Sequence, residues 1–132
     1  MSALGPKFLK VAEHVDDRGR LRIFEVDHTL PFVPLRSFVI SNVQRGKTRA
    51  GHILSCDQIL AMLQGACRLT VQSGTNKVEY HFTAQDGAIY LQRGTWLLLS
   101  EFDADAIMLA FASERFDFTR DHPDRVNTRR RL

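Results

Sequence analysis

The stretch GKTRAGHILSCDQILAMLQG, residues 46–65, decides how this chain can fold. It opens with a polar, glycine-containing segment, places His52 at the start of an apolar run, and ends on Gln64 and Gly65 before the run CRLTV. Glycine at such positions favours turns, and the apolar runs have the length of strands. The stretch therefore predicts a β-hairpin with His52 at its mouth.

The spacing within this stretch is similar to the first cupin motif, G-x5-H-x-H-x3-E-x6-G. Gly46, His52 and Gly65 stand at the two glycines and the first histidine. Leu54 and Gln58 stand at the second histidine and the glutamate. The scaffold spacing is kept, whereas most of the metal-binding side chains are replaced.

Length and composition predict a single domain. The chain has 132 residues, of which 44% are hydrophobic, and this suits one globular core. We expect the domain to span 1–132, with its core over about 8–120 and flexible termini at 1–6 and 125–132. The formal charge of +3 is modest, and much of the excess lies in RVNTRRRL at the end. We therefore expect no nucleic-acid partner.

Two further features of composition concern the compartment. The segment MSALGPKFLKV lacks the apolar run of a signal peptide, and no segment approaches the length of a membrane span. We therefore expect a cytoplasmic protein without a membrane partner. Cys56 and Cys67 lack the spacing of a zinc site, and in a reducing compartment we expect buried free thiols rather than a disulfide.

The rest of the chain is a series of short strand-like segments. Turns are predicted at Asp16–Gly19 and at Ser73–Asn76, between segments with alternating or apolar patterns. Pro31 and Pro34 interrupt LPFVPL, which we expect to be an extended crossing segment. No long amphipathic helix or repeat is evident. Many short strands at close spacing predict an all-β sandwich or barrel.

Two apolar runs predict strands that are covered on both faces. Residues 59–63 and 107–111 carry apolar side chains at nearly every position, which fits burial on both sides or packing at a subunit interface. A small antiparallel barrel has unpaired edges, and exchange of an N-terminal strand with a second copy would cover them. A homodimer is therefore predicted.

The order of segments along the chain resembles that of a known family. The segments, from about residue 8 to about residue 120, are DDRGRLRIFE, LPFVPLRSFVI, RAGH, QILAMLQGACRLTV, AIYLQRGTW and EFDADAIMLAFAS. They are similar to the bacterial nucleotide-sugar 3,4-ketoisomerases of the WxcM-like and FdtA-like group, a branch of the RmlC-like cupins. The Asp-x-Arg-Gly turn, the run Gln64–Arg68 and Trp96 before an acidic–Phe pair carry the resemblance.

The resemblance implies both a fold and an activity. The fold would be an RmlC-like cupin jelly roll, or double-stranded β-helix, in a strand-exchanged homodimer. The activity would be binding of a dTDP-linked 4-keto-6-deoxyhexose and transfer of its carbonyl to C3 through an enediol. The resemblance implies no metal and no organic cofactor.

The resemblance also directs attention to His52 as the proton-transfer group. The family motif R-G-x-H-x-H matches Arg49 and His52, with Leu54 at the second histidine. In an alternative alignment, His52 stands for the second histidine and Ala50 for the first. A histidine suits removal of a proton beside a carbonyl because its pKa lies near neutrality.

The second part of the family's site departs further. The family carries His-x-x-His after the tryptophan, whereas here Trp96 precedes Leu97, Leu98, Leu99 and Ser100. His52 with Gln58 falls short of the three ligands that a catalytic metal requires, so we expect no metal site.

Other polar residues are candidates for holding the ligand. Arg18, Arg36 and Arg49 are predicted to surround a diphosphate, because guanidinium offers paired donors of fixed geometry. Tyr90 is predicted to supply a catalytic hydroxyl, while Gln58 and Trp96 are predicted ligand contacts. For any single arginine, plain surface exposure is the commoner outcome.

Two functional hypotheses remain open from the sequence. One is an isomerase or epimerase of nucleotide sugars, working through His52 with Tyr90 or Asp57 as the second group. The other is a catalytically reduced cupin that binds a nucleotide sugar, or a related ligand, as an accessory or regulatory module. The family resemblance favours the first hypothesis, and the replaced histidines favour the second.

Overall fold

The computed structural model describes residues 5–117, and their regular structure is almost entirely β-strand. A five-stranded sheet has the order β1 (Lys7–Leu9), β9 (Ala88–Leu91), β6 (Gln58–Gln64), β11 (Ile107–Ala112) and β4 (Arg36–Ser41). A four-stranded sheet has the order β5 (Arg49–Ile53), β10 (Trp96–Ser100), β7 (Ala66–Ser73) and β8 (Asn76–Thr83). The predicted all-β class is confirmed, and the one helical element of this part of the chain is the 3-10 turn Ala84–Asp86.

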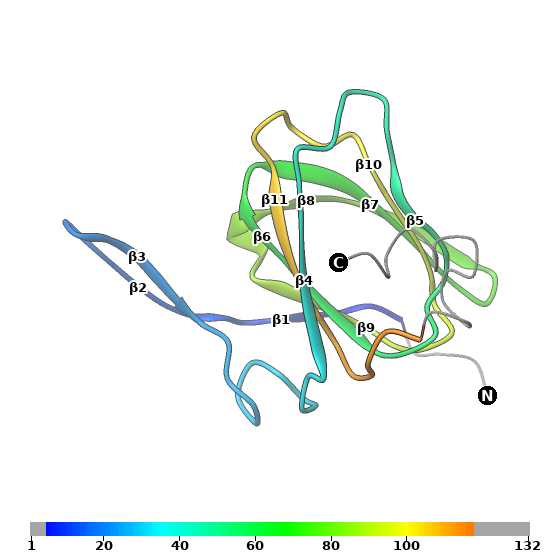
Figure 1. The fold of residues 1–132 in the computed structure, drawn as a ribbon, viewed down its shortest axis with the longest axis horizontal. Coiled ribbons are helices and arrows are strands. Elements are labelled where there is room, and N and C mark those ends of the chain that lie inside the picture. Colours follow the sequence, from blue (N-terminus) through cyan, green and yellow to red (C-terminus); the bar gives the residue numbers. More distant parts are fainter. Residues whose placement is uncertain (1–4, 118–132) are drawn as a thin grey trace.

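The two sheets share one apolar core. Along each central strand the side chains alternate between this core and the opposite face, as a pleated strand requires. Figure 1 shows the strands of both sheets wrapped around a common interior. Its largest fully buried members include Leu60 and Met62 of β6, Leu69 of β7, Phe82 of β8 and Leu97 of β10.

A second apolar cluster covers the outer face of the five-stranded sheet. Ile59 and Ala61 of β6 and Ala88 of β9 pack there against Leu30, with Phe32 beside them. The extended segment that contains the two prolines therefore lies over this face. The prediction of cover on both sides holds for residues 59–62, which are buried. Leu63 is 40% exposed, and Ile107, Leu109 and Phe111 are only half-buried.

The prediction that residues 46–65 form a hairpin is wrong. β5 pairs with β10, whereas β6 pairs with β9 and β11, so the two strands belong to different sheets. Leu54 crosses between the sheets, donating its N–H to Thr95 O at 2.8 Å and accepting from Gly94 N at 2.9 Å. Leu54 is buried, and its transfer into the core favours the crossing over a solvent-exposed turn.

Gly65 ends the same stretch where a turn was expected. Its φ of 71° lies in the left-handed region, and a Cβ there would stand 2.9 Å from Ala106 Cα. Only glycine fits such a position without displacement of the backbone.

A third element, the hairpin of β2 (Ala12–Asp16) and β3 (Gly19–Ile23), stands apart from both sheets. Figure 1 shows it projecting from the barrel, with its turn at the far end. Every residue of β2 is exposed. Near the base of the hairpin, Arg22 Nη1 donates to Met62 O at 2.7 Å, which ties β3 to β6.

Candidate functional site

His52 lies on β5 and faces the inside of the barrel. Its Cα partner on β10 is Leu97, whose side chain belongs to the core. The register of the two strands shifts between Leu97 and Leu98, opposite Gly51, whose φ is 81°. This bulge in the segment Arg49–His52 places His52 on the same side of the sheet as Leu97, while His52 stays exposed. His52 Nδ1 lies 3.3 Å from the carbonyl oxygen of Ile53.

The inward neighbours of His52 are apolar. Leu97 is its cross-strand partner and Leu54 follows it after one residue; each is 2% exposed and belongs to the core. These leucines occupy the positions at which the resemblance would place further imidazoles. The side of the site that Leu54 and Leu97 form therefore offers no group that can transfer a proton.

Arg36 and Gln58 form a polar row at one end of the barrel. Both are Cα partners of Ala112, from opposite sides of β11, so their side chains share its inner face. Gln58 is 8% exposed. The guanidinium carbon of Arg36 lies 5.7 Å from the ring centre of Phe38 and 5.4 Å from that of Phe116, distances typical of cation–π contacts.

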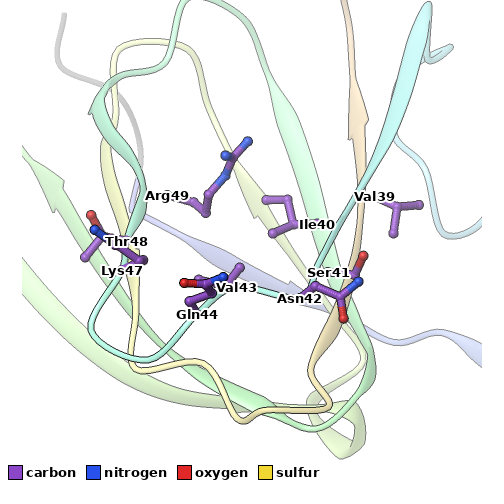
Figure 2. A pocket seen from close by; sticks show the side chains of 9 residues that line it. All are labelled: Val39, Ile40, Ser41, Asn42, Val43, Gln44, Lys47, Thr48 and Arg49. Carbon is purple, nitrogen blue, oxygen red and sulfur yellow. The ribbon is translucent and has the colours of Figure 1, made fainter.

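Arg49 shares the inner face of β5 with His52. Its Cα partner is the core residue Leu99. It lines a pocket of about 490 Å³ where the loop joining β4 to β5 closes the opposite end of β4 from Arg36. Figure 2 shows Arg49 and Ile40 on one side of β4 and Val39 on the other.

Tyr90 lies on the outer face of the five-stranded sheet, away from His52. It packs against the second apolar cluster beside Phe32, and its hydroxyl donates to Asp57 Oδ2 at 3.1 Å. Arg93 N donates to Asp57 Oδ1 at 2.8 Å. Burial, and then the hydrogen bond to the Asp57 carboxylate, raises the pKa of Tyr90. In a single copy, Tyr90 and Asp57 bind one another and are not placed beside the imidazole.

Trp96 and Arg18 also lie away from His52 in a single copy. Trp96 pairs with Ile53 and Gln72 on the face of β10 opposite to Leu97. Arg18 stands at the tip of the projecting hairpin, 86% exposed at its side chain and paired with Asp16 at 2.6 Å. The hydrogen bonds from Arg18 hold the pKa of Asp16 below its usual value.

The structure thus divides the predicted site. His52 and Arg49 share one face of β5, and Arg36 and Gln58 share one row. Sequence reasoning missed Phe116, which contacts Arg36 but comes from a distant part of the chain. It also missed Lys47, which lines the pocket with Arg49; its place two residues before the motif arginine was the available signal.

Two negative findings concern the part of the chain between residues 5 and 117. No group of three or more His, Cys, Asp or Glu side chains is arranged there to hold a metal ion. No helix in the same residues is long and apolar enough to cross a membrane.

Comparison with known proteins identifies the family. The model of the FdtA family, described as WxcM-like, C-terminal, matches residues 5–127. The chain belongs to this family. The resemblance inferred from the segment order is therefore confirmed.

Two similar proteins are named as enzymes of TDP-linked sugars. The TDP-4-oxo-6-deoxy-α-D-glucose-3,4-oxoisomerase of Aneurinibacillus thermoaerophilus is 25% identical over 114 residues, covering 86% of this chain and 82% of that protein. The WlaRB TDP-quinovose 3,4-ketoisomerase of Campylobacter jejuni is 26% identical, with a TM-score of 0.79 over 85% of this chain and 87% of its own.

A third comparison supports the fold. QdtA, a sugar 3,4-ketoisomerase from Thermoanaerobacterium thermosaccharolyticum solved in complex with TDP, has a TM-score of 0.81 at 21% identity. The match covers 96% of both chains. The fold of this chain is an RmlC-like cupin jelly roll, as the sequence predicted.

Proposed function

We propose that this chain is a nucleotide-sugar 3,4-ketoisomerase that acts on a TDP-linked 4-keto-6-deoxyhexose in deoxysugar biosynthesis. The observation that carries the proposal is His52, opposite the core residue Leu97, in a chain of the FdtA family that is similar to TDP-sugar 3,4-ketoisomerases. We also propose a cytoplasmic location, which the two buried free thiols, Cys56 and Cys67, support.

The reaction needs a base beside C3 and a hydrogen-bond donor for the enediolate oxygen. His52 takes the proton from C3, beside the C4 carbonyl, and the electron pair moves to form a C3–C4 enediol. A proton then returns to C4 while the C3 hydroxyl becomes the new carbonyl, so no external oxidant or reductant is required. The amide of Gln58, on the inner face, supplies a donor for the enediolate oxygen.

The burial of Leu54 and Leu97 favours the second candidate, a cupin that binds the nucleotide sugar without turnover. A single positioned acid–base group contributes about two to four orders of magnitude in rate. Without a second imidazole beside His52, we expect turnover slower than that of a two-histidine site. The two candidates therefore differ in rate while they share a ligand.

Deuterium incorporation separates the two candidates. The protein is incubated with TDP-4-keto-6-deoxyglucose in deuterated water, and the sugar is followed by NMR for the 3-keto product and for label. We expect product formation that falls by at least tenfold in His52→Gln. His81→Gln is the matched control, because His81 is an exposed histidine on the other edge strand of the same sheet.

Two more variants sharpen the assignment. Leu97→His places a second imidazole next to His52, and we expect it to raise the rate. Tyr90→Phe should keep the wild-type rate within about threefold, because Tyr90 faces the other side of its sheet; a larger loss would restore Tyr90 to the catalytic set. If the wild-type protein and all the variants bind TDP tightly and none forms product, the accessory binder is established instead.

We further propose a homodimer in which the β2–β3 hairpin packs on the second copy. The hairpin leaves Val15 64% and Leu21 58% exposed, and β4 is an unpaired edge of the five-stranded sheet. Isolated two-stranded hairpins are marginal in water, so a second surface is needed. Exchange of the hairpin would also carry Arg18 toward the barrel of the other copy.

Sedimentation tests the dimer. We expect wild-type protein to sediment as a dimer at micromolar concentration and Leu21→Asp to shift toward monomer without unfolding of the barrel. If the wild-type protein sediments as a monomer at that concentration, the dimer proposal is refuted, and so is the proposed role of Arg18 in ligand binding.

A further inference from the structure

Two crossing segments run side by side at the end of the barrel where β6 begins. One joins β5 to β6 over residues 54–57, and the other joins β9 to β10 over residues 92–95. Two backbone hydrogen bonds join them, from Leu54 N to Thr95 O at 2.8 Å and from Gly94 N to Leu54 O at 2.9 Å. The position of β5 relative to β6 therefore depends on how these segments are held together.

Asp57 ends the first crossing segment and is bound through both its side chain and its backbone. Its carboxylate accepts from the Tyr90 hydroxyl at 3.1 Å and from Arg93 N at 2.8 Å. Its N–H donates to Ser113 Oγ at 3.0 Å, and its carbonyl oxygen accepts from Ser113 N at 3.0 Å. These hydrogen bonds fix Asp57 between β9, the second crossing segment and the residue that follows β11.

Gln58 follows Asp57 directly and takes the opposite face of β6. Side chains alternate along a strand, so Asp57 lies on the outer face with Tyr90, and Gln58 lies on the inner face with Leu60. Gln58 is 8% exposed, and its Cα partners come from β9 and β11, the same two strands beside which Asp57 is bound. The backbone held at Asp57 therefore sets where the Gln58 amide enters the barrel.

We propose that Asp57 is a positioning residue that fixes the Gln58 amide relative to the His52 imidazole. In the proposed function, on which this role rests, His52 removes the proton from C3 and Gln58 donates to the enediolate oxygen. The strands that carry these two groups belong to different sheets, so their spacing depends on the crossing that ends at Asp57. A misplacement of about 1 Å between reacting groups costs up to about a hundredfold in rate.

One of the bonds to Asp57 can be removed without a change in its side chain. Arg93 stands at the second position of a turn that begins at Gln92, in which Thr95 N donates to Gln92 O at 3.1 Å and Gly94 has a φ of 93°. Proline is favoured at the second position of such turns. Arg93→Pro therefore removes the N–H that binds Asp57 and still suits the turn, whereas Arg93→Ala removes the same side chain and keeps the N–H.

Steady-state kinetics on the TDP-linked keto sugar test the role of Asp57. We expect Asp57→Ala to lower kcat by about ten- to a hundredfold and to change KM by less than about twofold, because the enediolate forms only after binding. Asp57→Asn keeps an acceptor for Arg93 N and should retain kcat within about threefold of wild type. Arg93→Pro should lower kcat by about three- to tenfold, and Arg93→Ala should leave it unchanged.

Asp86 provides the control for the loss of a carboxylate with a purely structural role. It accepts from Thr83 N at 2.7 Å and from Thr83 Oγ1 at 3.3 Å, so it binds one backbone N–H and one hydroxyl, as the Asp57 carboxylate does. Asp86→Ala should lower the midpoint of thermal unfolding but keep kcat within about twofold of wild type. Equal losses of kcat in Asp86→Ala and Asp57→Ala would show a general loss of stability and overturn the proposal.

The NMR signal of the Gln58 side-chain amide separates this role from the proposed function. In isotope-labelled protein, the signal is assigned by its loss in Gln58→Leu. We expect it to shift or broaden in Asp57→Ala and Arg93→Pro and to stay near its wild-type position in Asp57→Asn and Arg93→Ala. An unchanged signal in the first two variants would overturn the proposal at any level of activity. If the signal moves as expected and the wild-type protein forms no product, the isomerase is refuted and the positioning of Gln58 by Asp57 is supported.

Discussion

The molecule contains two antiparallel hairpins with opposite surroundings. β7–β8 turns at Gly74 and buries one face, including Leu69, Val71 and Phe82, in the shared core. β2–β3 turns before Gly19 and buries almost nothing in a single copy. The same local pairing therefore gives one hairpin that forms part of the core, β7–β8, and one that projects from it, β2–β3, called the arm below. The difference lies in what packs against the apolar face of each hairpin.

The largest expected effect is the loss of stability when a leucine is truncated in the buried hairpin, compared with the same change in the arm. Leu69→Ala should cost about 2–5 kcal/mol in the free energy of unfolding, because it removes a fully buried side chain and leaves a cavity. Leu21→Ala, in the free hairpin, should cost less. Chemical denaturation at two protein concentrations measures both.

Concentration dependence sharpens this contrast. In the proposed dimer the cost of Leu21→Ala grows with protein concentration, whereas that of Leu69→Ala stays constant. A Leu21→Ala cost equal to that of Leu69→Ala at every concentration would show that the arm is packed within a single copy.

The next effect is a pH dependence of the unfolding free energy, which comes from Cys67 on the β7–β8 hairpin. Burial, and then the negative charge of Asp103, raises the pKa of Cys67 from 9.0 to about 12. The folded state thus favours the neutral thiol, so its contribution is complete below about pH 9 and is lost as pH rises toward 12. We expect roughly 2 kcal/mol of this contribution to disappear by pH 11.

Cys67→Ala tests this expectation. The variant should lose less stability than wild type between pH 8 and about pH 11, as measured by urea denaturation at each pH. Parallel curves for the two proteins would contradict the assignment to Cys67.

A smaller effect compares the two turns. Gly74 has a φ of 60°, which other residues adopt at moderate cost, whereas Gly19 has a φ of 124°, where side chains are rarely found. A Cβ at either position meets nothing within 4 Å, so strain alone decides. We expect Gly19→Ala to cost about 1–3 kcal/mol and Gly74→Ala about 1 kcal/mol. Thermal unfolding of both variants measures the order, and a reversed order would contradict it.

The smallest effect concerns the exposed ion pairs across the hairpins. Arg20 pairs with Glu13 at 2.7 Å on the arm, and Arg68 pairs with Glu79 at 2.6 Å on the β7–β8 hairpin. Exposed pairs of this kind contribute about 0–1 kcal/mol. Glu13→Gln and Glu79→Gln should each change the unfolding free energy by less than about 1 kcal/mol. A larger loss in Glu13→Gln alone would place the arm against a second surface.

The structure brings only some of the predicted site residues together, and the geometry of β5 is the reason. Residues three apart, such as Arg49 and His52, would lie on opposite faces of a regular strand, because side chains alternate with a period of two. The bulge at Gly51 instead puts both opposite the core residues Leu99 and Leu97. Arg18, Arg36 and Arg49 were predicted to surround one diphosphate, but a single copy places them on the arm and at two ends of the barrel. The spacing of residues within one strand does not determine at which end of the barrel that strand begins, so it could not show that the three arginines lie apart.

The sequence by itself determined the all-β class and the succession of strand segments along the chain, because both follow from local patterns. The resemblance to the family, rather than any local pattern, identified Leu54 and Leu97 as standing where the family has imidazoles. The tertiary structure decided that residues 46–65 cross between sheets, that Tyr90 binds Asp57 on the outer face, and that Lys47 joins Arg49 at one pocket. Each of these depends on which distant strands pack together, and that choice is made by burial of the whole core rather than by any one segment.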